Sequence, residues 1–574
     1  MNKKDLIPEQ TSAVPEQTSV VPEQTSAVPE LVEGSANIII SDFPDPDVIR
    51  VGDIYYMVST TMHFMPGCVI LRSYNLIDWE FASYVYDKLE TTNGQLLMDN
   101  RGVYGKGMWA ASLSYHDNKF YVCFVANDTH KSYLFTSDKI EGPWTRSEIK
   151  GFYHDMSLFW DDDGRVFVVH GNTDIHLTEL ESDLSGPKKG GLDKIIIQDD
   201  REKVGLGYEG SHLYKINRRY YNFMIHMPKG KMRTQGCYFA DNIEGPWTGR
   251  DVLCSDLGNW NSGVAQGGIV QDKEGKWFGI LFQDHGALGR IPVLVPVSFG
   301  EDGFPLFGDD ANKSGPSRAS GTTVGSVVPE AESVVPEPES VVPEPVEGPA
   351  LSTPQTLTVL DNKPGYKYSP LWSNDFTNPA WQWNHIPDPR GYTLQTNLYT
   401  IQTKKLVKNI TQAANTYTQR TFTEKCAGSV ILDAGKIGEG DFAGLAALEG
   451  EYGFIAVTKR DGKYYLVAAE HKSKNEPWAM GVFETDPPTI KEEIPLKSPK
   501  LELKLIFDLT RAKQQVQLLY REKPGKGEFQ QLGKPVQLRY TLDQFVGVRF
   551  ALFCYSTKQA GGQADFTDFN YSFW

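Results

Sequence analysis

The chain has 574 residues, of which 40% are hydrophobic, 12% aromatic and 23% charged. This composition supplies enough apolar side chains for folded cores and excludes a chain that is disordered throughout or fibrous. The net charge of −16 comes from 57 basic and 73 acidic residues, and no basic stripe points to a nucleic-acid partner. The apolar runs are shorter than the roughly 18 residues that span a bilayer, so no membrane partner is expected.

Two tracts of the chain are rich in proline and glutamate. Proline recurs every seven residues in both, at Pro15, Pro22 and Pro29 and again at Pro329, Pro336 and Pro343. This spacing forbids a helix and offers no face to bury, so we predict disordered segments at residues 1–35 and 311–355. The tracts leave two folded domains, at residues 36–310 and 356–574.

The first residues contain lysines but no apolar core of a secretory signal. The sequence as written therefore predicts a cytoplasmic protein. Export is the alternative, if the native signal is missing from this sequence.

Residues 36–310 contain a hairpin-like unit five times, in which turn residues precede alternating aromatic and aliphatic residues. The turns lie at intervals of 46 to 66 residues, at Gly52, Asn118, Gly164, Arg218 and Gly275. Turns rich in glycine and asparagine between β-prone runs are typical of hairpins. Five all-β units of this length predict a five-bladed β-propeller, because a plain sandwich would not need such regular spacing.

The strand before each turn is expected to line the central channel of the propeller. Counting back nine residues from four turns reaches Trp109, Asp155, Glu209 and Gln266, and counting back seven from the first turn reaches Asp45. Converging carboxylates suit glycosidic bond cleavage, in which one acid protonates the leaving oxygen and another activates water. A turn cap explains any one of these acids alone, but their equivalent placement favours the catalytic interpretation.

Several tracts of this domain resemble glycoside hydrolase family 43. They are residues 42–56, which contain Pro44-Asp45-Pro46, residues 153–164, residues 208–214, and the pair 266–268 and 283–290. The resemblance covers nearly all of residues 36–300 in the family's order. It departs from the family at Ala111, where proline is more frequent.

The resemblance implies a five-bladed propeller that inverts the anomeric centre. It implies that Asp45 is the general base that activates water and that Glu209 is the general acid. Asp155 would hold the acid in position and tune it.

Five further residues are candidates for substrate binding. Trp109 is a candidate stacking platform for a sugar, with core packing as the equal alternative. Arg290 suits a sugar hydroxyl or the Asp155 carboxylate, with a surface salt bridge as the alternative. Gln266 occupies the repeat position in the fifth unit, and Phe64 is placed in the pocket wall by its position after the first hairpin alone.

His285, the fifth candidate, has three interpretations. It lines the sugar pocket, or it lies on the propeller axis and holds a calcium ion through water as in some relatives, or it is a packed core histidine. Residues 564–569 are a second candidate for a structural calcium site. No redox or organic cofactor is implied, and none is expected to be required.

Residues 356–574 are also rich in strands and predict one β-sandwich. Residues 371–376 and 381–385 look like the concanavalin-like sandwich appended to many family 43 xylosidases and arabinofuranosidases. In those relatives the sandwich packs on the propeller and can lend a loop to the rim of the active site. The alternative is an independent carbohydrate-binding module.

These observations predict an exo-acting, inverting glycoside hydrolase. It would release terminal α-L-arabinofuranose, with β-D-xylose close behind, from oligosaccharides of the arabinoxylan or arabinan type, because residues 161–180 resemble the arabinofuranosidases. The alternatives are a β-xylosidase, an endo-arabinanase and a non-catalytic sugar-binding propeller. The three acids argue against the last and the appended sandwich against the endo enzyme, and the sequence does not predict the oligomeric state.

Overall fold

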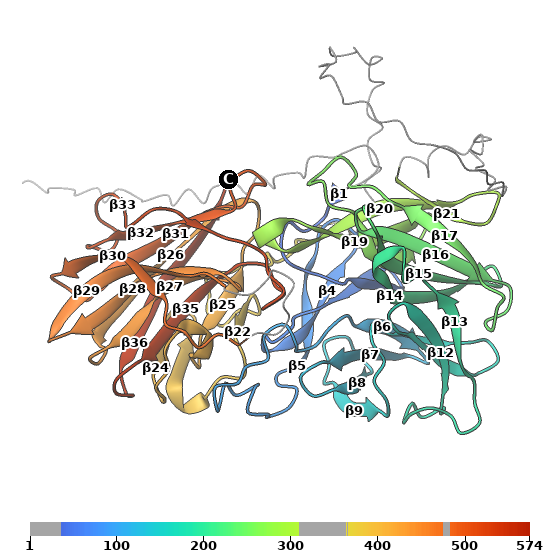
Figure 1. Ribbon diagram of the computed structural model, residues 1–574, viewed down its shortest axis with the longest axis horizontal. Helices are drawn as coiled ribbons and strands as arrows, with labels where there is room; N and C mark the ends of the chain where they lie inside the picture. Colours follow the sequence, from blue (N-terminus) through green and yellow to red (C-terminus); the bar gives the residue numbers. More distant parts are fainter. Residues whose placement is uncertain (1–35, 309–362, 364, 474–482) are drawn as a thin grey trace, which may run out of the picture.

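The structure is a computed structural model that describes residues 36–308, 363, 365–473 and 483–574. The segments predicted to be disordered, 1–35 and 311–355, lie outside these residues. The described chain is all-β, with a five-bladed propeller and a concanavalin-like sandwich side by side (Figure 1), which confirms the predicted fold class. No helix in the described part is long and apolar enough to cross a membrane.

The first four blades are four-stranded antiparallel sheets whose strands pair in chain order. Their strands are β2 (Asp47–Val51), β3 (Ile54–Ser59), β4 (Gly67–Ser73) and β5 (Glu80–Tyr86); β6 (Ser112–His116), β7 (Lys119–Ala126), β8 (Lys131–Ser137) and β9 (Thr145–Ile149); β10 (Ser157–Trp160), β11 (Val166–His170), β12 (Asp174–Leu180) and β13 (Asp193–Gln198); and β14 (Val204–Ile216), β15 (Arg219–Pro228), β16 (Thr234–Ala240) and β17 (Thr248–Leu253).

The fifth blade joins the two ends of the propeller. It contains β18 (Ala265–Gln271), β19 (Trp277–Asp284) and β20 (Arg290–Phe299), and its outer edge is shared by β1 (Ala36–Asn37) and β21 (Pro305–Phe307). Ala36 of β1 lies opposite Leu294 of β20 in antiparallel register. The start of the described chain therefore completes the last blade and closes the ring.

The five predicted turns each join the inner strand of a blade to its second strand, so the inner strands are β2, β6, β10, β14 and β18. Side-chain oxygens on these strands accept backbone N–H groups of the next inner strand: Leu113 N to Asp47 Oδ2 (2.8 Å), Leu158 N to Ser112 Oγ (3.2 Å) and Leu213 N to Ser157 Oγ (3.0 Å). Strands β2, β6, β10 and β14 line an open cavity of about 270 Å³. The repeat thus builds a ring in which the first residues of the inner strands lie at the same end of the channel.

The C-terminal domain packs two sheets face to face. The seven-stranded sheet has the order β22 (Trp381–Trp383), β25 (Tyr417–Arg420), β35 (Arg549–Ser556), β27 (Asp441–Leu448), β28 (Tyr452–Arg460), β29 (Lys463–His471) and β30 (Thr489–Leu496). The other has the order β23 (Tyr392–Gln395), β24 (Leu398–Gln402), β36 (Gln563–Phe573), β26 (Lys425–Lys436), β31 (Lys500–Asp508), β32 (Gln515–Arg521) and β33 (Gln530–Gln531), with β34 (Val536–Gln537) also paired to β32.

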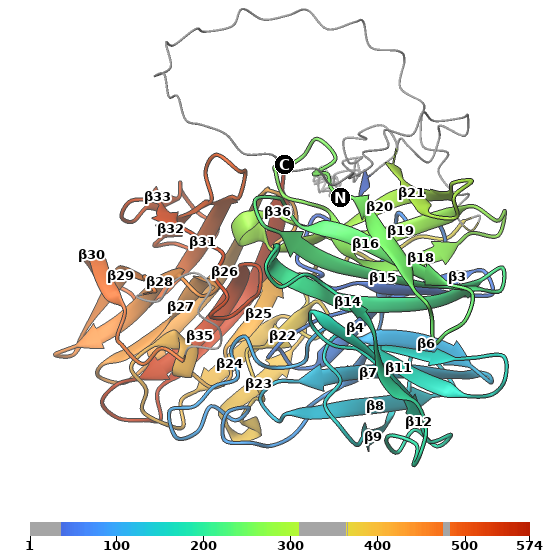
Figure 2. The same cartoon turned by 45° about the vertical axis from the view of Figure 1, so that its right-hand side comes forward.

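The two domains share one hydrophobic core. Phe43 and Leu288 of the propeller belong to the same buried cluster as Phe422 and Phe550 of the sandwich. The rings of Phe43 and Phe422 lie 6.5 Å apart. The sandwich therefore packs on the first and fifth blades, as Figure 2 shows from a second side.

Candidate active site

Two of the three predicted acids precede an inner strand by two residues. Asp45 comes before β2 and Asp155 before β10, and both have left-handed backbone with φ of 51° and 48°. Gln266, at the entrance of β18, has φ of 63°. Such a conformation is uncommon outside glycine, so its recurrence shows that the repeat places these three residues equivalently.

Glu209 lies inside the long strand β14, where the pairing with β15 is irregular on both sides of it. An irregularity of this kind bends a strand and redirects a side chain. Gly210 has φ of +65°, and a Cβ atom there would lie 2.9 Å from the side chain of Gln266. Glycine is therefore required next to Glu209 by both the backbone and the contact.

Glu209, Asp155 and His154 meet at one point. One carboxylate oxygen of each acid and one ring nitrogen of His154 all lie within 4.8 Å of one another. His154 Nε2 is 3.2 Å from Glu209 Oε2, and Asn172 Nδ2 donates to the same oxygen at 2.5 Å. Neither His154 nor Asn172 was predicted from the sequence. The position of His154 directly before Asp155 is a signal that could have indicated a role for His154.

Burial and neighbouring charges set the ionisation of this cluster. Burial raises the pKa of Asp155, the Glu209 and Asp45 carboxylates raise it further, and His154 opposes them. Burial lowers the pKa of His154, but the Asp155 and Glu209 carboxylates outweigh it and leave the pKa raised. Both shifts favour the protonated forms of Asp155 and His154, which suits proton transfer.

Asp45 is paired with Arg290. Arg290 Nη1 lies 2.8 Å from Asp45 Oδ1, and both side chains are buried. Burial raises the pKa of Asp45 although Arg290 acts against it. Arg290 Nε and Nη2 are buried and have no hydrogen-bond partner in the described chain. Arg290 thus pairs with Asp45 rather than with Asp155, and its two remaining donor groups are enclosed by the protein.

The sandwich contributes to the rim of the site through Phe545. Its ring lies 4.2 Å from the Arg290 guanidinium and 5.9 Å from the ring of Trp109. Nearby, Gly547 N donates to Asp42 Oδ2 at 2.9 Å, which anchors this loop on the propeller. Trp109 is half-buried and also contacts His154 at 5.8 Å. The rim therefore combines aromatic side chains of both domains.

Phe64 and His285 lie behind this surface. Phe64 has no exposed surface and lies under the Arg549 guanidinium, 3.4 Å from its ring centroid. His285 is buried, stacks on Trp260 at 4.6 Å and contacts Gln283 Oε1 at 2.9 Å. Phe64 therefore supports the rim from within, and His285 braces the Trp260 loop.

Among the described residues, no group of three or more acids, cysteines or histidines that could hold a metal ion lies at either predicted calcium place. The one metal-sized group of acids, cysteines or histidines found among them is His154, Asp155 and Glu209. Burial lowers the pKa of His285 to about 3, and no carboxylate contacts its ring. In residues 564–569, Asp565 accepts from Thr400 and Asp568 from Asn397, so each already has a protein partner.

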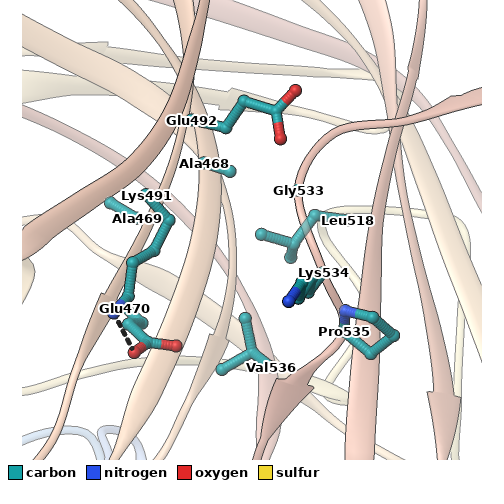
Figure 3. A pocket seen from close by; sticks show the side chains of 10 residues that line it. All are labelled: Ala468, Ala469, Glu470, Lys491, Glu492, Leu518, Gly533, Lys534, Pro535 and Val536. Carbon is teal, nitrogen blue, oxygen red and sulfur yellow. Dashed lines mark ion pairs between the residues drawn. The ribbon is translucent and has the colours of Figure 1, made fainter.

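A separate hollow of about 430 Å³ lies between β29 and β30 of one sheet of the sandwich and β32 and β34 of the other (Figure 3). Its walls carry the ion pair of Lys491 with Glu470 at 2.9 Å, together with Lys534 and Glu492 over an apolar floor. None of its ten lining residues is aromatic. It therefore lacks the stacking platform that a carbohydrate-binding module would use.

The comparisons with known families match both domains. Residues 35–305 match the family described as glycosyl hydrolases family 43. Residues 372–572 match the beta xylosidase C-terminal concanavalin A-like domain. The two matches follow the propeller and the sandwich of the structure.

Individual relatives agree with these matches. A "Beta-xylosidase" of Formosa agariphila is 25% identical over 62% of this chain and 59% of its own length. A "Non-reducing end alpha-L-arabinofuranosidase BoGH43B" of Bacteroides ovatus is 27% identical over 48% of this chain and 53% of its own. The chain thus spans little more than half the length of these curated relatives. The solved structure of a bifunctional GH43-CE protein of Bacteroides eggerthii is 34% identical, with a TM-score of 0.77 over 94% of this chain and 64% of that one.

Proposed function

Because the chain belongs to glycoside hydrolase family 43, we propose that it is an exo-acting, inverting glycoside hydrolase that releases terminal pentoses from oligosaccharides. One observation carries this proposal. Asp45, Asp155 and Glu209 gather at the same end of the inner strands, and the Asp45 and Glu209 charges both raise the pKa of Asp155. A non-catalytic sugar-binding propeller would not need three acids in this arrangement.

In the proposed mechanism Asp45 is the general base and Glu209 is the general acid. Asp45, which pairs with Arg290 at 2.8 Å, accepts a proton from the water that attacks the anomeric carbon. Glu209 donates a proton to the leaving oxygen on the opposite face of the sugar. His154 Nε2, which lies 3.2 Å from the Glu209 carboxylate and 3.8 Å from that of Asp155, holds the proton donor in place.

The rim supports exo action on a small terminal sugar. Phe545 covers the Arg290 side of the site from the sandwich, and Trp109 offers an aromatic face beside His154. The names of the relatives support both β-D-xylose and α-L-arabinofuranose as that sugar, so we propose that one pocket accepts both.

The test is hydrolysis of aryl β-D-xylosides and aryl α-L-arabinofuranosides side by side, with wild type and Glu209→Ala. Proton magnetic resonance of the first product identifies its anomer, and the inverted anomer is expected. Glu209→Ala should lose roughly 10²- to 10⁴-fold on natural oligosaccharides and much less on activated aryl glycosides, whose leaving groups need little protonation. A wild type that cleaves neither aryl pentoside, or that releases the retained anomer, contradicts the proposal.

A further inference from the structure

His226 on β15 is held between two carboxylates. Its Nδ1 lies 2.7 Å from Asp199 Oδ2 and its Nε2 lies 2.8 Å from Asp251 Oδ1. A carboxylate only accepts hydrogen bonds, and a neutral imidazole has one N–H, so both contacts together require the imidazolium. Among the described residues, the other charged group at this clamp is Lys231, whose Nζ lies 4.0 Å from Asp251 Oδ2.

This clamp holds the residue directly before Glu209. The ring of Tyr208 stacks on the His226 ring, with centroids 4.1 Å apart and planes 13° apart. It also makes an edge-on contact with the ring of Tyr238 at 5.4 Å. Tyr208 N donates to Asp199 Oδ2 at 3.1 Å, the same oxygen that His226 contacts. His226 therefore fixes both the side chain and the backbone of Tyr208.

The same network reaches Glu209 from a second side. Thr173 N donates to Tyr208 O at 2.7 Å, and Asp199 N donates to Thr173 O at 2.9 Å. Thr173 Oγ1 donates to Asn172 Oδ1 at 2.9 Å, and Asn172 Nδ2 donates to Glu209 Oε2 at 2.5 Å. Asp199 thus ties together the two segments that carry and orient the Glu209 carboxylate.

We propose that His226, through Asp199 and Tyr208, is a positioning residue for the Glu209 proton donor. It lies outside the site and touches neither substrate nor Glu209. Without the imidazolium, the Asp199 carboxylate loses the cation that it contacts, and Tyr208 loses its stacking partner. The irregular stretch of β14 that aims Glu209 then relaxes. This inference rests on the proposed function, because it assumes that Glu209 delivers the proton.

The test compares leaving groups rather than total activity. Wild type, His226→Gln, Glu209→Ala and Arg72→Gln are assayed on a dinitrophenyl pentoside and on the matching methyl pentoside or disaccharide. Arg72→Gln is the control, since Arg72 pairs with the buried Glu80 at 2.6 Å on the first blade and has no bond to this network. It destabilises without moving Glu209.

His226→Gln is expected to lose at least about tenfold more kcat on the poor leaving group than on the dinitrophenyl one, within the range a general acid supplies. Arg72→Gln should lose equally on both. If His226→Gln also loses equally on both, the positioning role is wrong while the acid role of Glu209 stands. If Glu209→Ala itself shows no selective loss, the proposed function fails, and the inference fails with it. Should His226→Gln not fold, Asp251→Asn replaces it, because that change keeps the His226–Asp199 contact and should show the same selectivity to a smaller degree.

Discussion

Replacing Arg290 with glutamine leaves the Asp45 carboxylate buried without its cation. The Arg290 and Asp45 side chains are 3% and 7% exposed and their charged atoms lie 2.8 Å apart. Breaking a buried pair by removing one partner costs roughly 3–5 kcal/mol. For a domain of this size that corresponds to a fall of about 10 °C in Tm.

The pH dependence of this loss identifies its cause. Burial already raises the pKa of Asp45 in the folded state, and removal of Arg290 raises it further. A raised pKa gives stability that is present below the unfolded value of about 3.9 and is lost as pH rises through the folded value. The Tm deficit of Arg290→Gln should therefore be largest near neutral pH and shrink as the solution is acidified.

Thermal unfolding at several pH values, followed by circular dichroism, measures this deficit. Arg549→Gln is the matched control, because Arg549 is equally buried and has no carboxylate within 4 Å in the described chain, bonding instead to Gln382 at 2.9 Å. Its deficit should not depend on pH in the acidic range. A deficit of Arg290→Gln that is constant with pH, or that grows on acidification, would refute the reasoning. In kinetics, the acidic limb of kcat/KM should move to higher pH in Arg290→Gln, because Asp45 must be ionised to act as a base.

Three further predictions follow from single contacts. Phe545→Ala should raise KM for pentose oligosaccharides by about tenfold, since one aromatic contact beside Arg290 is worth about 1–1.5 kcal/mol; unchanged steady-state kinetics would exclude a rim role. Gly210→Ala should destabilise by more than about 1 kcal/mol in urea unfolding, because φ is +65° and the new Cβ meets Gln266 at 2.9 Å; a stabilised variant would contradict the strain. Burial lowers the pKa of His226, but its hydrogen bonds to Asp251 and Asp199 outweigh burial and leave the pKa raised. The Tm deficit of His226→Gln should therefore be greater near pH 6 than near pH 9. The opposite order in calorimetry would contradict the presence of the imidazolium.

The repeat in the sequence predicted the inner strands of the propeller because each hairpin turn is a local signal. Counting back from Gly164 to Asp155 succeeded since Asp155 lies at a strand entrance that the repeat reproduces at Asp45. The closing strand β1 (Ala36–Asn37) carries no such signal, because two residues have no periodicity and their pairing with β20 is set by tertiary contacts alone.

The contacts around the acids were less accessible to sequence reasoning. Phe545 approaches Arg290 from the other domain, and His226 reaches Glu209 through Asp199 and Tyr208. These are contacts between residues far apart in the chain, and no local propensity encodes them. Phe64 was placed in the pocket wall by its position after a hairpin, whereas the structure buries it completely beneath Arg549.

The shared core of the two domains bears on how the chain is made. The ring cannot close until β20 leaves the ribosome and meets β1. The apolar residues beside that junction, among them Phe43 and Leu294, belong to the buried cluster that continues into the sandwich. Until the sandwich has been synthesised, this surface faces solvent in the nascent chain, which exposes it to aggregation. A chain that ends at residue 308 is therefore expected to bind a hydrophobic dye more strongly than the full chain. The sandwich buries the apolar surface of the propeller and so protects it while the propeller finishes folding.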